Sequence, residues 1–275
     1  MNTIVIGGDL TVARMGFGAM RLCGAGVMGY PADRAAALAV LRRAVQLGVT
    51  LIDTADAYGP GVNEDQIAQA LYPYPKGLVI ATKGGNLRPD GRWVPDGRPA
   101  HLRAACEASL QRLRLERIDL YQWHAPDPTV PFADSIGALK ELREAGKIRH
   151  IGLSNVSVAQ LRAARAIVPI VSVQNRYNLG ARESDDVLDA CTRDGLAFLP
   201  YFPIEAGDLA KAGGALRRVA DRHQATTAQV ALAWLLQRSP AVVPIPGTSS
   251  LAHLAENFAA AGLSLDAEDL SALAA

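Results

Sequence analysis

The sequence is poor in cysteine. Cys23, Cys106 and Cys191 are the three cysteines among 275 residues, and no two of them form a CxxC pair. An odd number of widely separated thiols does not suit a disulfide framework or a zinc site built on cysteine pairs. We therefore expect free thiols, no metal site and a reducing, cytoplasmic compartment.

An excess of charge of either sign is also missing. The 28 Lys and Arg residues against 27 Asp and Glu residues give a net charge of +1, so no basic surface for nucleic acid or membrane is indicated. The most apolar stretch, Val230 to Leu236, is too short to span a bilayer. The opening MNTIVIGGDL lacks a basic segment followed by a long apolar run, so we expect no signal peptide.

Linkers and low-complexity segments are absent as well. With 49% hydrophobic and 20% charged residues the composition is that of a globular enzyme, and Gly213-Gly214 is too brief to separate two domains. We expect residues 1–275 to form one domain. Nothing in the sequence signals an oligomer, so a monomer is the expectation.

What the sequence does contain is a repeated alternation of short apolar runs with helical patterns. The runs are continuous rather than alternating, which is typical of parallel strands buried on both faces. The expected strands are Arg14–Gly18, Leu51–Asp53, Leu78–Ala81, Ile118–Tyr121, Ile148–Gly152, Ile170–Val173, Ala197–Leu199 and Val242–Ile245.

Two architectures have parallel strands joined by helices, a closed barrel and an open doubly wound sheet. Eight evenly spaced units favour the barrel. The segment before the first strand reads as a hairpin with Gly7-Gly8 at its turn. The sequence thus predicts an α/β fold, a (β/α)8 TIM barrel with an N-terminal β-hairpin.

Polar residues follow the expected strands, where a barrel brings loops together at one face. Asp53, Lys83 and His124 stand at or just after three strands, and Tyr58 lies in the loop beyond Asp53. Each alone has an ordinary structural explanation, such as a turn, a solvated charge or packing. Their occurrence together, each beyond a different strand or loop, indicates an active site.

The four side chains suit the reduction of a carbonyl group. A free tyrosine is a weak acid with a pKa near 10. The ammonium of Lys83, held by Asp53, is expected to lower the pKa of Tyr58. His124 can donate a hydrogen bond to a carbonyl oxygen beside it. The set provides a general acid and a clamp for the oxygen that gains charge.

At this point the sequence resembles the aldo-keto reductase superfamily. The resemblance is carried by GVTLIDTADAYG (48–59), by Ala81-Thr82-Lys83, by the run from Ile118 to His124, and by GKIRHIGLSN (146–155). It covers nearly the whole chain in order. It implies a catalytic tetrad of Asp53, Tyr58, Lys83 and His124, a small-molecule carbonyl substrate, and NAD(P)H bound without a Rossmann domain.

The resemblance also implies a set of cofactor-binding residues. Ser154, Asn155 and Gln174 would bind the nicotinamide carboxamide, and Tyr201 would stack on the nicotinamide ring. The segment from Gly247 to Ser250 and the helix after it would hold the adenosine end. The full set is Gly18, Ala19, Met20, Asp53, Ser154, Asn155, Gln174, Tyr201, Phe202, Pro203, Ile204, Gly207, Leu209, Gly247, Thr248, Ser249, His253, Glu256 and Asn257.

Two positions depart from the common pattern of the family. Many members carry a lysine where Gly247 stands and an arginine where His253 stands, and both cations favour the 2′-phosphate of NADPH. NADPH remains the expected cofactor, with NADH as the alternative. The stretches 228–240 and 244–250 resemble a bacterial branch that includes pyridoxal reductases, so pyridoxal is one expected substrate. Trp93, Trp123, Tyr30 and Tyr177 are candidates for the pocket wall.

Three other interpretations remain open. Residues 24–29, GAGVMG, match GxGxxG, but they do not lie directly between a strand and a helix as a Rossmann fingerprint does. A non-catalytic NAD(P)H-binding sensor or regulatory barrel would not need Tyr58 and Lys83 together. An aldolase or isomerase barrel would use Lys83 as a Schiff-base lysine and 247–250 for a substrate phosphate.

Overall fold

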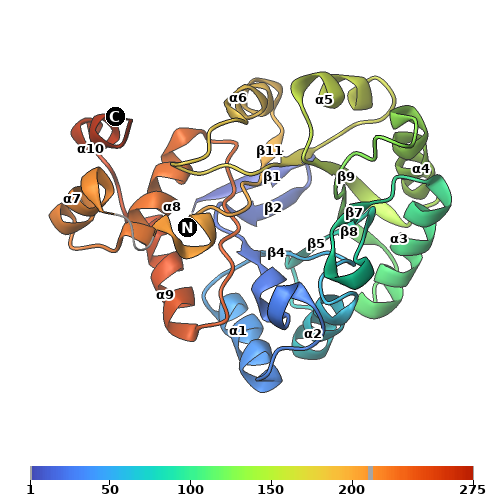
Figure 1. Cartoon of the computed structure of the whole chain (residues 1–275), viewed down its shortest axis with the longest axis horizontal. Helices are drawn as coiled ribbons and strands as arrows, with labels where there is room; N and C mark the ends of the chain where they lie inside the picture. Colours follow the sequence, from blue (N-terminus) through green and yellow to red (C-terminus); the bar gives the residue numbers. More distant parts are fainter. Residues whose placement is uncertain (1, 210–212, 275) are drawn as a thin grey trace.

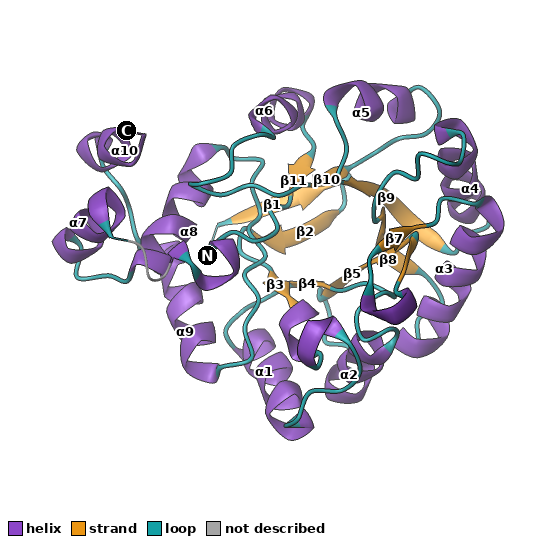
Figure 2. Cartoon of the chain, viewed as in Figure 1, coloured by secondary structure: helices purple, strands orange, loops and turns teal. Residues whose placement is uncertain are grey.

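A ring of parallel strands surrounded by helices forms the centre of the molecule (Figures 1 and 2). The computed structural model describes residues 2–209 and 213–274. Seven strands are hydrogen-bonded in the order β3-β4-β5-β8-β9-β10-β11, and every neighbouring pair is parallel. These strands are β3 (Phe17–Gly18), β4 (Leu51–Asp53), β5 (Val79–Gly84), β8 (Ile118–Trp123), β9 (Ile148–Ser154), β10 (Ser172–Gln174) and β11 (Ala197–Phe198).

The extended segment 242–246 closes the ring between β11 and β3. On one side the Val243 amide donates to the Phe198 carbonyl at 2.8 Å, and on the other the Gly16 amide donates to the Pro244 carbonyl at 2.9 Å. Pro244 and Pro246 have no N–H group, so the segment cannot form a regular ladder and makes only an isolated bridge. The predicted barrel is confirmed, although its eighth strand is irregular for this reason.

The helices cover the outside of the ring because their apolar residues recur on one side. In α1, for example, Ala37, Leu41 and Ala44 share the buried face. The helices are α1 (Arg34–Gln46), α2 (Val62–Leu71), α3 (Pro99–Leu113), α4 (Phe132–Glu144), α5 (Val158–Arg165), α6 (Asp185–Asp194), α7 (Gly214–Arg222), α8 (Thr227–Arg238), α9 (Leu251–Ala259) and α10 (Ala267–Ala274). Helices α7 and α10 pack together at one side (Figure 1).

The predicted N-terminal hairpin is present, and it closes one end of the barrel. Strands β1 (Thr3–Ile6) and β2 (Leu10–Ala13) are joined through Gly7 and Gly8, whose φ angles of 63° and 86° suit glycine. The hairpin buries Ile6, Leu10 and Val12 against the side chains that fill the barrel interior. Because the Ala13 amide bonds to Thr50 just before β4, the hairpin covers the N-terminal ends of the strands. The opposite end stays open for a site.

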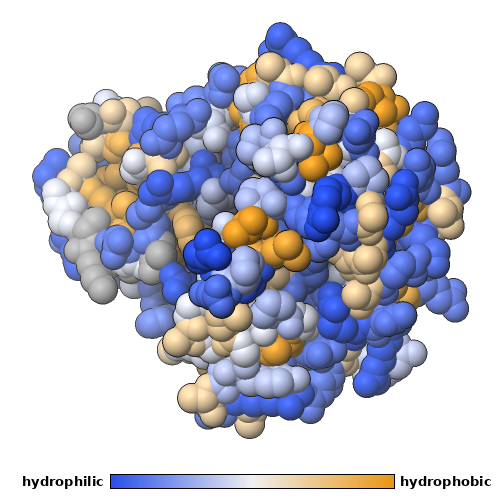
Figure 3. Space-filling view, turned by 45° about the vertical axis from the view of Figure 1, so that its right-hand side comes forward, coloured by the Kyte–Doolittle hydropathy of each residue, from blue (hydrophilic) through white to orange (hydrophobic). Residues whose placement is uncertain are grey.

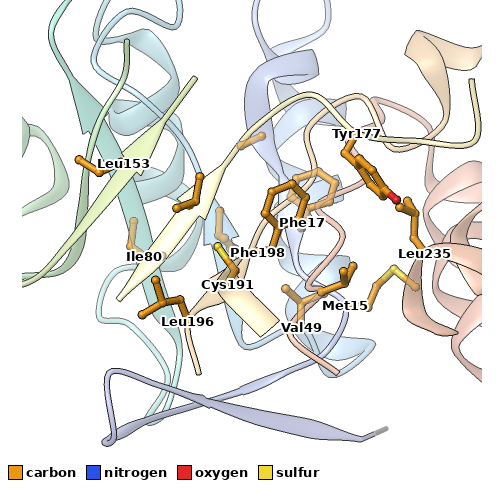
Figure 4. Packing of buried hydrophobic residues seen from close by; sticks show 14 of the residues in the cluster. Met15, Phe17, Val49, Ile80, Leu153, Tyr177, Cys191, Leu196, Phe198 and Leu235 are labelled. Carbon is orange, nitrogen blue, oxygen red and sulfur yellow. The ribbon is translucent and has the colours of Figure 1, made fainter. Parts of the chain in front are cut away.

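The larger apolar cluster lies between the strands and the helices (Figure 4). Phe17 and Phe198 come from neighbouring parts of the ring, and Tyr177 and Leu235 pack with them. On the face shown in Figure 3, hydrophilic residues predominate and hydrophobic ones form small, separate patches. Within the described part of the chain, no helix combines the length and apolar character that crossing a membrane requires.

Candidate active site

The structure brings Asp53, Lys83 and Tyr58 into one hydrogen-bonded chain. The Lys83 ammonium lies 2.5 Å from Asp53 Oδ1, 2.9 Å from the Thr54 carbonyl oxygen and 3.3 Å from the Tyr58 hydroxyl. Asp53 ends β4, and Lys83 lies in the neighbouring strand β5. Asp53 and Lys83 are 2% and 1% exposed, so this ion pair is withdrawn from water and its geometry is fixed.

His124 lies beside Tyr58, directly after β8. The two rings make an edge-to-face contact with 5.8 Å between centroids. Burial, with added repulsion from Lys83 and Arg88, holds the pKa of His124 well below its usual range. The imidazole is therefore neutral at neutral pH, and its single N–H can serve a carbonyl oxygen without adding a second cation beside Lys83.

The protonation of Tyr58 differs from the expectation. Lys83 does favour the phenolate, but burial of the hydroxyl has the larger effect, so the pKa of Tyr58 is raised above its ordinary value. The sequence could place an ammonium near Tyr58 but could not reveal how completely the hydroxyl is desolvated. The consequence is that Tyr58 keeps its proton across the neutral range. A group with this property donates a proton only when charge develops on a bound acceptor.

A single cavity of about 950 Å³ extends from these residues across the open end of the barrel. Tyr58, His124 and Trp93 lie at one part of it, and the segment after the eighth strand lies at another. The residues that line it are Gly18, Met20, Arg21, Val27, Asp53, Tyr58, Asn86, Trp93, Pro95, His124, Ala125, Ser154, Asn155, Gln174, Tyr201, Phe202, Pro203, Ile204, Gly207, Ala228, Ile245, Gly247, Thr248, Ser249, His253, Glu256 and Asn257.

The residues expected to bind nicotinamide lie together next to the acid. The Tyr201 hydroxyl donates to Asn155 Oδ1 at 2.8 Å, and Asn155 Nδ2 donates to Ser154 Oγ at 3.1 Å. Gln174 Nε2 donates to Asp53 Oδ2 at 2.8 Å, which leaves its amide oxygen as the group that can face a ligand. The Tyr201 ring is thereby held at the wall of the cavity by a polar partner.

The other part of the cavity is shaped by close backbone approach. A Cβ atom at Gly18 would lie 2.6 Å from the Ile245 carbonyl oxygen, and one at Gly247 would collide with the Gly18 carbonyl oxygen. Neither position accepts a side chain. Just beyond, Ser250 caps α9 by accepting the His253 amide at 3.3 Å, so free helix N–H groups and hydroxyls border this end.

Comparison with known proteins agrees with this geometry. The model of the Aldo/keto reductase family matches residues 14–275. The chain belongs to the aldo-keto reductase family. It is 47% identical to an uncharacterized oxidoreductase of Schizosaccharomyces pombe over 262 residues, which are 95% of this chain and 85% of the relative. Over 279 residues it is 46% identical to pyridoxine 4-dehydrogenase of Escherichia coli, covering 99% and 97% of the two chains.

Solved structures show the same family. An aldo-keto reductase from Klebsiella pneumoniae in complex with NADPH superposes with a TM-score of 0.82 at 27% identity, covering 99% of this chain and 93% of that one. The chain described here is therefore an oxidoreductase on a (β/α)8 barrel, in which a nicotinamide cofactor and a carbonyl group react. The resemblance to the pyridoxal reductase branch is supported by the Escherichia coli relative.

Some expected residues lie away from the cavity of this aldo-keto reductase. Ala19 is fully buried with its carbonyl bonded to Asn63, and Leu209 packs against the main core. Of the four aromatic candidates only Trp93 lines the cavity. Trp123 packs on Phe132, Tyr30 is exposed against Arg34, and Tyr177 is a core residue beside Leu235 (Figure 4).

The glycine-rich residues 24–29 form a loop at the mouth of the barrel. The Gly29 amide donates to the Gly59 carbonyl and the Gly59 amide donates back to Val27, so this loop is joined to the loop that carries Tyr58. Val27 lines the cavity. As expected from the sequence, this loop does not lie directly between a strand and a helix as a dinucleotide-binding fingerprint does.

Three residues of the site could not be, or were not, identified from the sequence. Gln122 donates to Asp53 Oδ2 at 3.0 Å. Its spacing in the sequence could have indicated this, because it lies in a strand two residues before His124 and so faces the barrel interior. Arg88 lies in a loop at the substrate end, and Arg21 lies in a short helical turn at the rim of the cavity. No local pattern distinguishes such arginines from solvated ones.

Proposed function

We propose that this protein reduces an aldehyde or ketone to an alcohol with NADPH, and that Asp53, Tyr58, Lys83 and His124 are its catalytic residues. In this proposal residues 1–275 act as one catalytic domain. The observation that carries it is the buried chain from Asp53 through Lys83 to the Tyr58 hydroxyl, open to the same cavity as His124.

Tyr58 would give its proton to the carbonyl oxygen. Its raised pKa keeps the proton in place until the oxygen gains charge, and Lys83 at 3.3 Å stabilises the phenolate that remains. Asp53 holds Lys83 charged, and Gln122 and Gln174 fix the second carboxylate oxygen of Asp53. The acid is thus connected to a rigid set of interior side chains.

His124 would orient the substrate. A carbonyl oxygen placed between the Tyr58 hydroxyl and the neutral imidazole can accept a hydrogen bond from each. Two fixed donors aimed at the oxygen stabilise the negative charge that develops there. The edge-to-face contacts of Trp93 with Tyr58 and His124, at 6.1 and 5.7 Å between centroids, complete an aromatic wall.

The remaining cavity residues fit a nicotinamide dinucleotide. When bound, NADPH supplies the hydride that adds to the carbonyl carbon. Ser154, Asn155 and Gln174 offer donors and acceptors for a carboxamide, and the Tyr201 ring offers a flat face beside them. At the far end, the exclusion of side chains at Gly18 and Gly247 leaves backbone surface against which a ligand can lie.

The rest of the proposed cofactor site follows the lining of the cavity. Met20, Phe202, Pro203, Ile204 and Gly207 line its length between the two ends. Thr248, Ser249, His253, Glu256 and Asn257 line the end assigned to adenosine, with Glu256 held by the Thr226 hydroxyl at 2.6 Å. Among aldehydes, pyridoxal is the first candidate, because a flat ring suits the aromatic wall and a relative that is 46% identical is a pyridoxine 4-dehydrogenase.

The test is NADPH oxidation with a panel of aldehydes that includes pyridoxal, for wild type and Tyr58→Phe. Loss of the acid should lower turnover at least a hundredfold while the affinity for NADPH changes little, because the phenol acts on the substrate. Tyr74→Phe is the matched control, since its hydroxyl donates to the Leu113 carbonyl outside the cavity. Normal turnover by Tyr58→Phe would remove Tyr58 from the mechanism. Cofactor binding without turnover of any aldehyde would favour a non-catalytic sensor.

A further inference from the structure

The described part of the cavity wall has few cationic side chains. Among the described residues that line the cavity, Arg21 is the one lysine or arginine. A phosphorylated dinucleotide carries a pyrophosphate and a phosphate monoester, and proteins bind such groups with arginine or lysine and with helix N-termini. Gly247, where a side chain would collide with the Gly18 carbonyl oxygen, cannot supply a cation.

Arg21 occupies the space beside that glycine. It belongs to the short helical turn η1 (Ala19–Leu22), which follows β3 directly, so its backbone is anchored at the edge of the ring. Its Cγ atom lies 3.6 Å from the position that a Cβ atom of Gly247 would take. The Arg21 side chain therefore passes beside Gly247 and lines the cavity there.

The guanidinium of Arg21 also has no partner among the described residues. It makes no hydrogen bond or ion pair with any residue in 2–209 or 213–274, and the side chain is exposed. Other arginines near the site are occupied: Arg88 donates to four backbone carbonyls, and Arg176 is paired with Glu205. An arginine without a partner can bind an anion without breaking an existing contact.

We propose that Arg21 binds the 2′-phosphate of the cofactor and so sets the preference for NADPH over NADH. This inference rests on the proposed function and deepens it. The guanidinium is planar and can donate two parallel hydrogen bonds to a phosphate. The assignment to the 2′-phosphate, rather than the pyrophosphate, follows from the place of Arg21 beside Gly247, which borders the end of the cavity assigned to adenosine.

Binding measurements test this without reference to turnover. The dissociation constants of NADPH and NADH are measured by quenching of the tryptophan fluorescence, because Trp93 lines the cavity. Arg21→Gln should weaken NADPH roughly tenfold or more and leave NADH unchanged, since only NADPH carries the charged group that loses its partner. Arg21→Lys should lose less, because it keeps the charge but not the planar fork.

The matched control is Arg117→Gln. Arg117 is exposed like Arg21, but it precedes β8 at the opposite end of the barrel, so its loss should change neither constant. Added salt should weaken NADPH binding to wild type more than to Arg21→Gln, because one ionic contact is missing in the variant.

Two outcomes overturn the inference. Equal weakening of NADPH and NADH would mean that Arg21 serves the pyrophosphate, and unchanged NADPH binding would mean that Arg21 is only a surface charge. In either case the proposed function still stands, because wild type binds the cofactor. Failure of wild type to bind either dinucleotide would instead overturn the proposed function itself.

Discussion

The guanidinium of Arg88 lies 3.7 Å from the centroid of the Trp93 ring. The same side chain, which is 8% exposed, donates to the carbonyls of Gly26 and Gly91 at 2.8 Å and to that of Ala57 at 3.4 Å. Arg88 thereby joins three loops at the substrate end: the glycine-rich loop, the loop of Tyr58 and the turn before Trp93. We therefore expect this side chain to hold the wall of the substrate pocket in place.

We expect Arg88→Lys to loosen that wall. A lysine cannot reach several carbonyls at once or stack flat on Trp93, so buried carbonyls lose their donors, at a cost of roughly 2 kcal/mol in the free energy of unfolding. KM for the aldehyde should rise several-fold while the dissociation constant of NADPH stays near that of wild type. Arg92→Lys, on the exposed side of the same turn, is the control. An unchanged KM would show that the loops hold their positions without Arg88.

The two partners in the buried ion pair should move the pH dependence in opposite directions. Lys83 lowers and Asp53 raises the pKa of Tyr58. Lys83→Met should therefore shift the alkaline limb of the reduction rate to higher pH, and Asp53→Asn should shift it to lower pH, because reduction requires protonated Tyr58. Steady-state reduction rates between pH 6 and 11 measure the alkaline limb of each variant. A shift of both variants in the same direction would contradict the assignment of Tyr58 as the acid.

Asp56 should make the fold sensitive to pH. Burial, reinforced by the nearby charge of Glu64, raises the pKa of Asp56 to about 8, and its Oδ1 has no hydrogen-bond partner among the described residues. In the unfolded chain the pKa is about 4. The folded state therefore binds more protons than the unfolded state between these values, so stability falls as pH rises from about 4 to about 8 and then levels.

Asp56→Asn should remove that part of the pH dependence, because an amide resembles the protonated carboxyl and does not titrate. In urea unfolding at pH 5, 7 and 9, the variant should gain stability relative to wild type as pH rises. Asp65→Asn, exposed on α2, is the control and should not show this trend. A constant difference between Asp56→Asn and wild type at all three values would mean that Asp56 is ionised in the folded protein.

His253→Arg should strengthen NADPH binding relative to NADH. His253 lines the adenosine end of the cavity and is exposed, so a longer permanent cation fits there without repacking the core. The ratio of the two dissociation constants, measured as for Arg21, should rise several-fold in favour of NADPH. An unchanged ratio would place the 2′-phosphate out of reach of this position.

The sequence was sufficient wherever a residue's place follows from the strand it ends. Asp53, Lys83 and His124 lie at or just after the C-terminal ends of parallel strands, and a closed ring brings these ends together at one face. The hairpin could be predicted because its two glycines allow a tight turn. These inferences depend on local pattern plus one topological rule, which is why they were possible without coordinates.

The rest depended on how loops and side chains pack. The positions of Arg21 and Arg88 follow from the paths of loops, which no periodicity encodes. Tyr177 was a candidate for the pocket wall, yet its ring lies in the core and stacks on Trp234. The raised pKa of Tyr58 reflects desolvation by neighbours distant in sequence. Prolines 244 and 246 were visible, but their effect on the last strand emerges only from its pairing.

Pro244 and Pro246 accept hydrogen bonds from β3 and its flanking residue but cannot donate any, where the barrel closes. The amides of Gly16 and Gly18 donate to the carbonyls of Pro244 and Pro246, and the prolines can return nothing. The same Gly18 and Gly247 border the cavity in which a dinucleotide is proposed to lie. A bound cofactor would then hold β3 and the segment 242–246 together. Amide hydrogen exchange at Gly16 and Gly18 should slow when the cofactor binds.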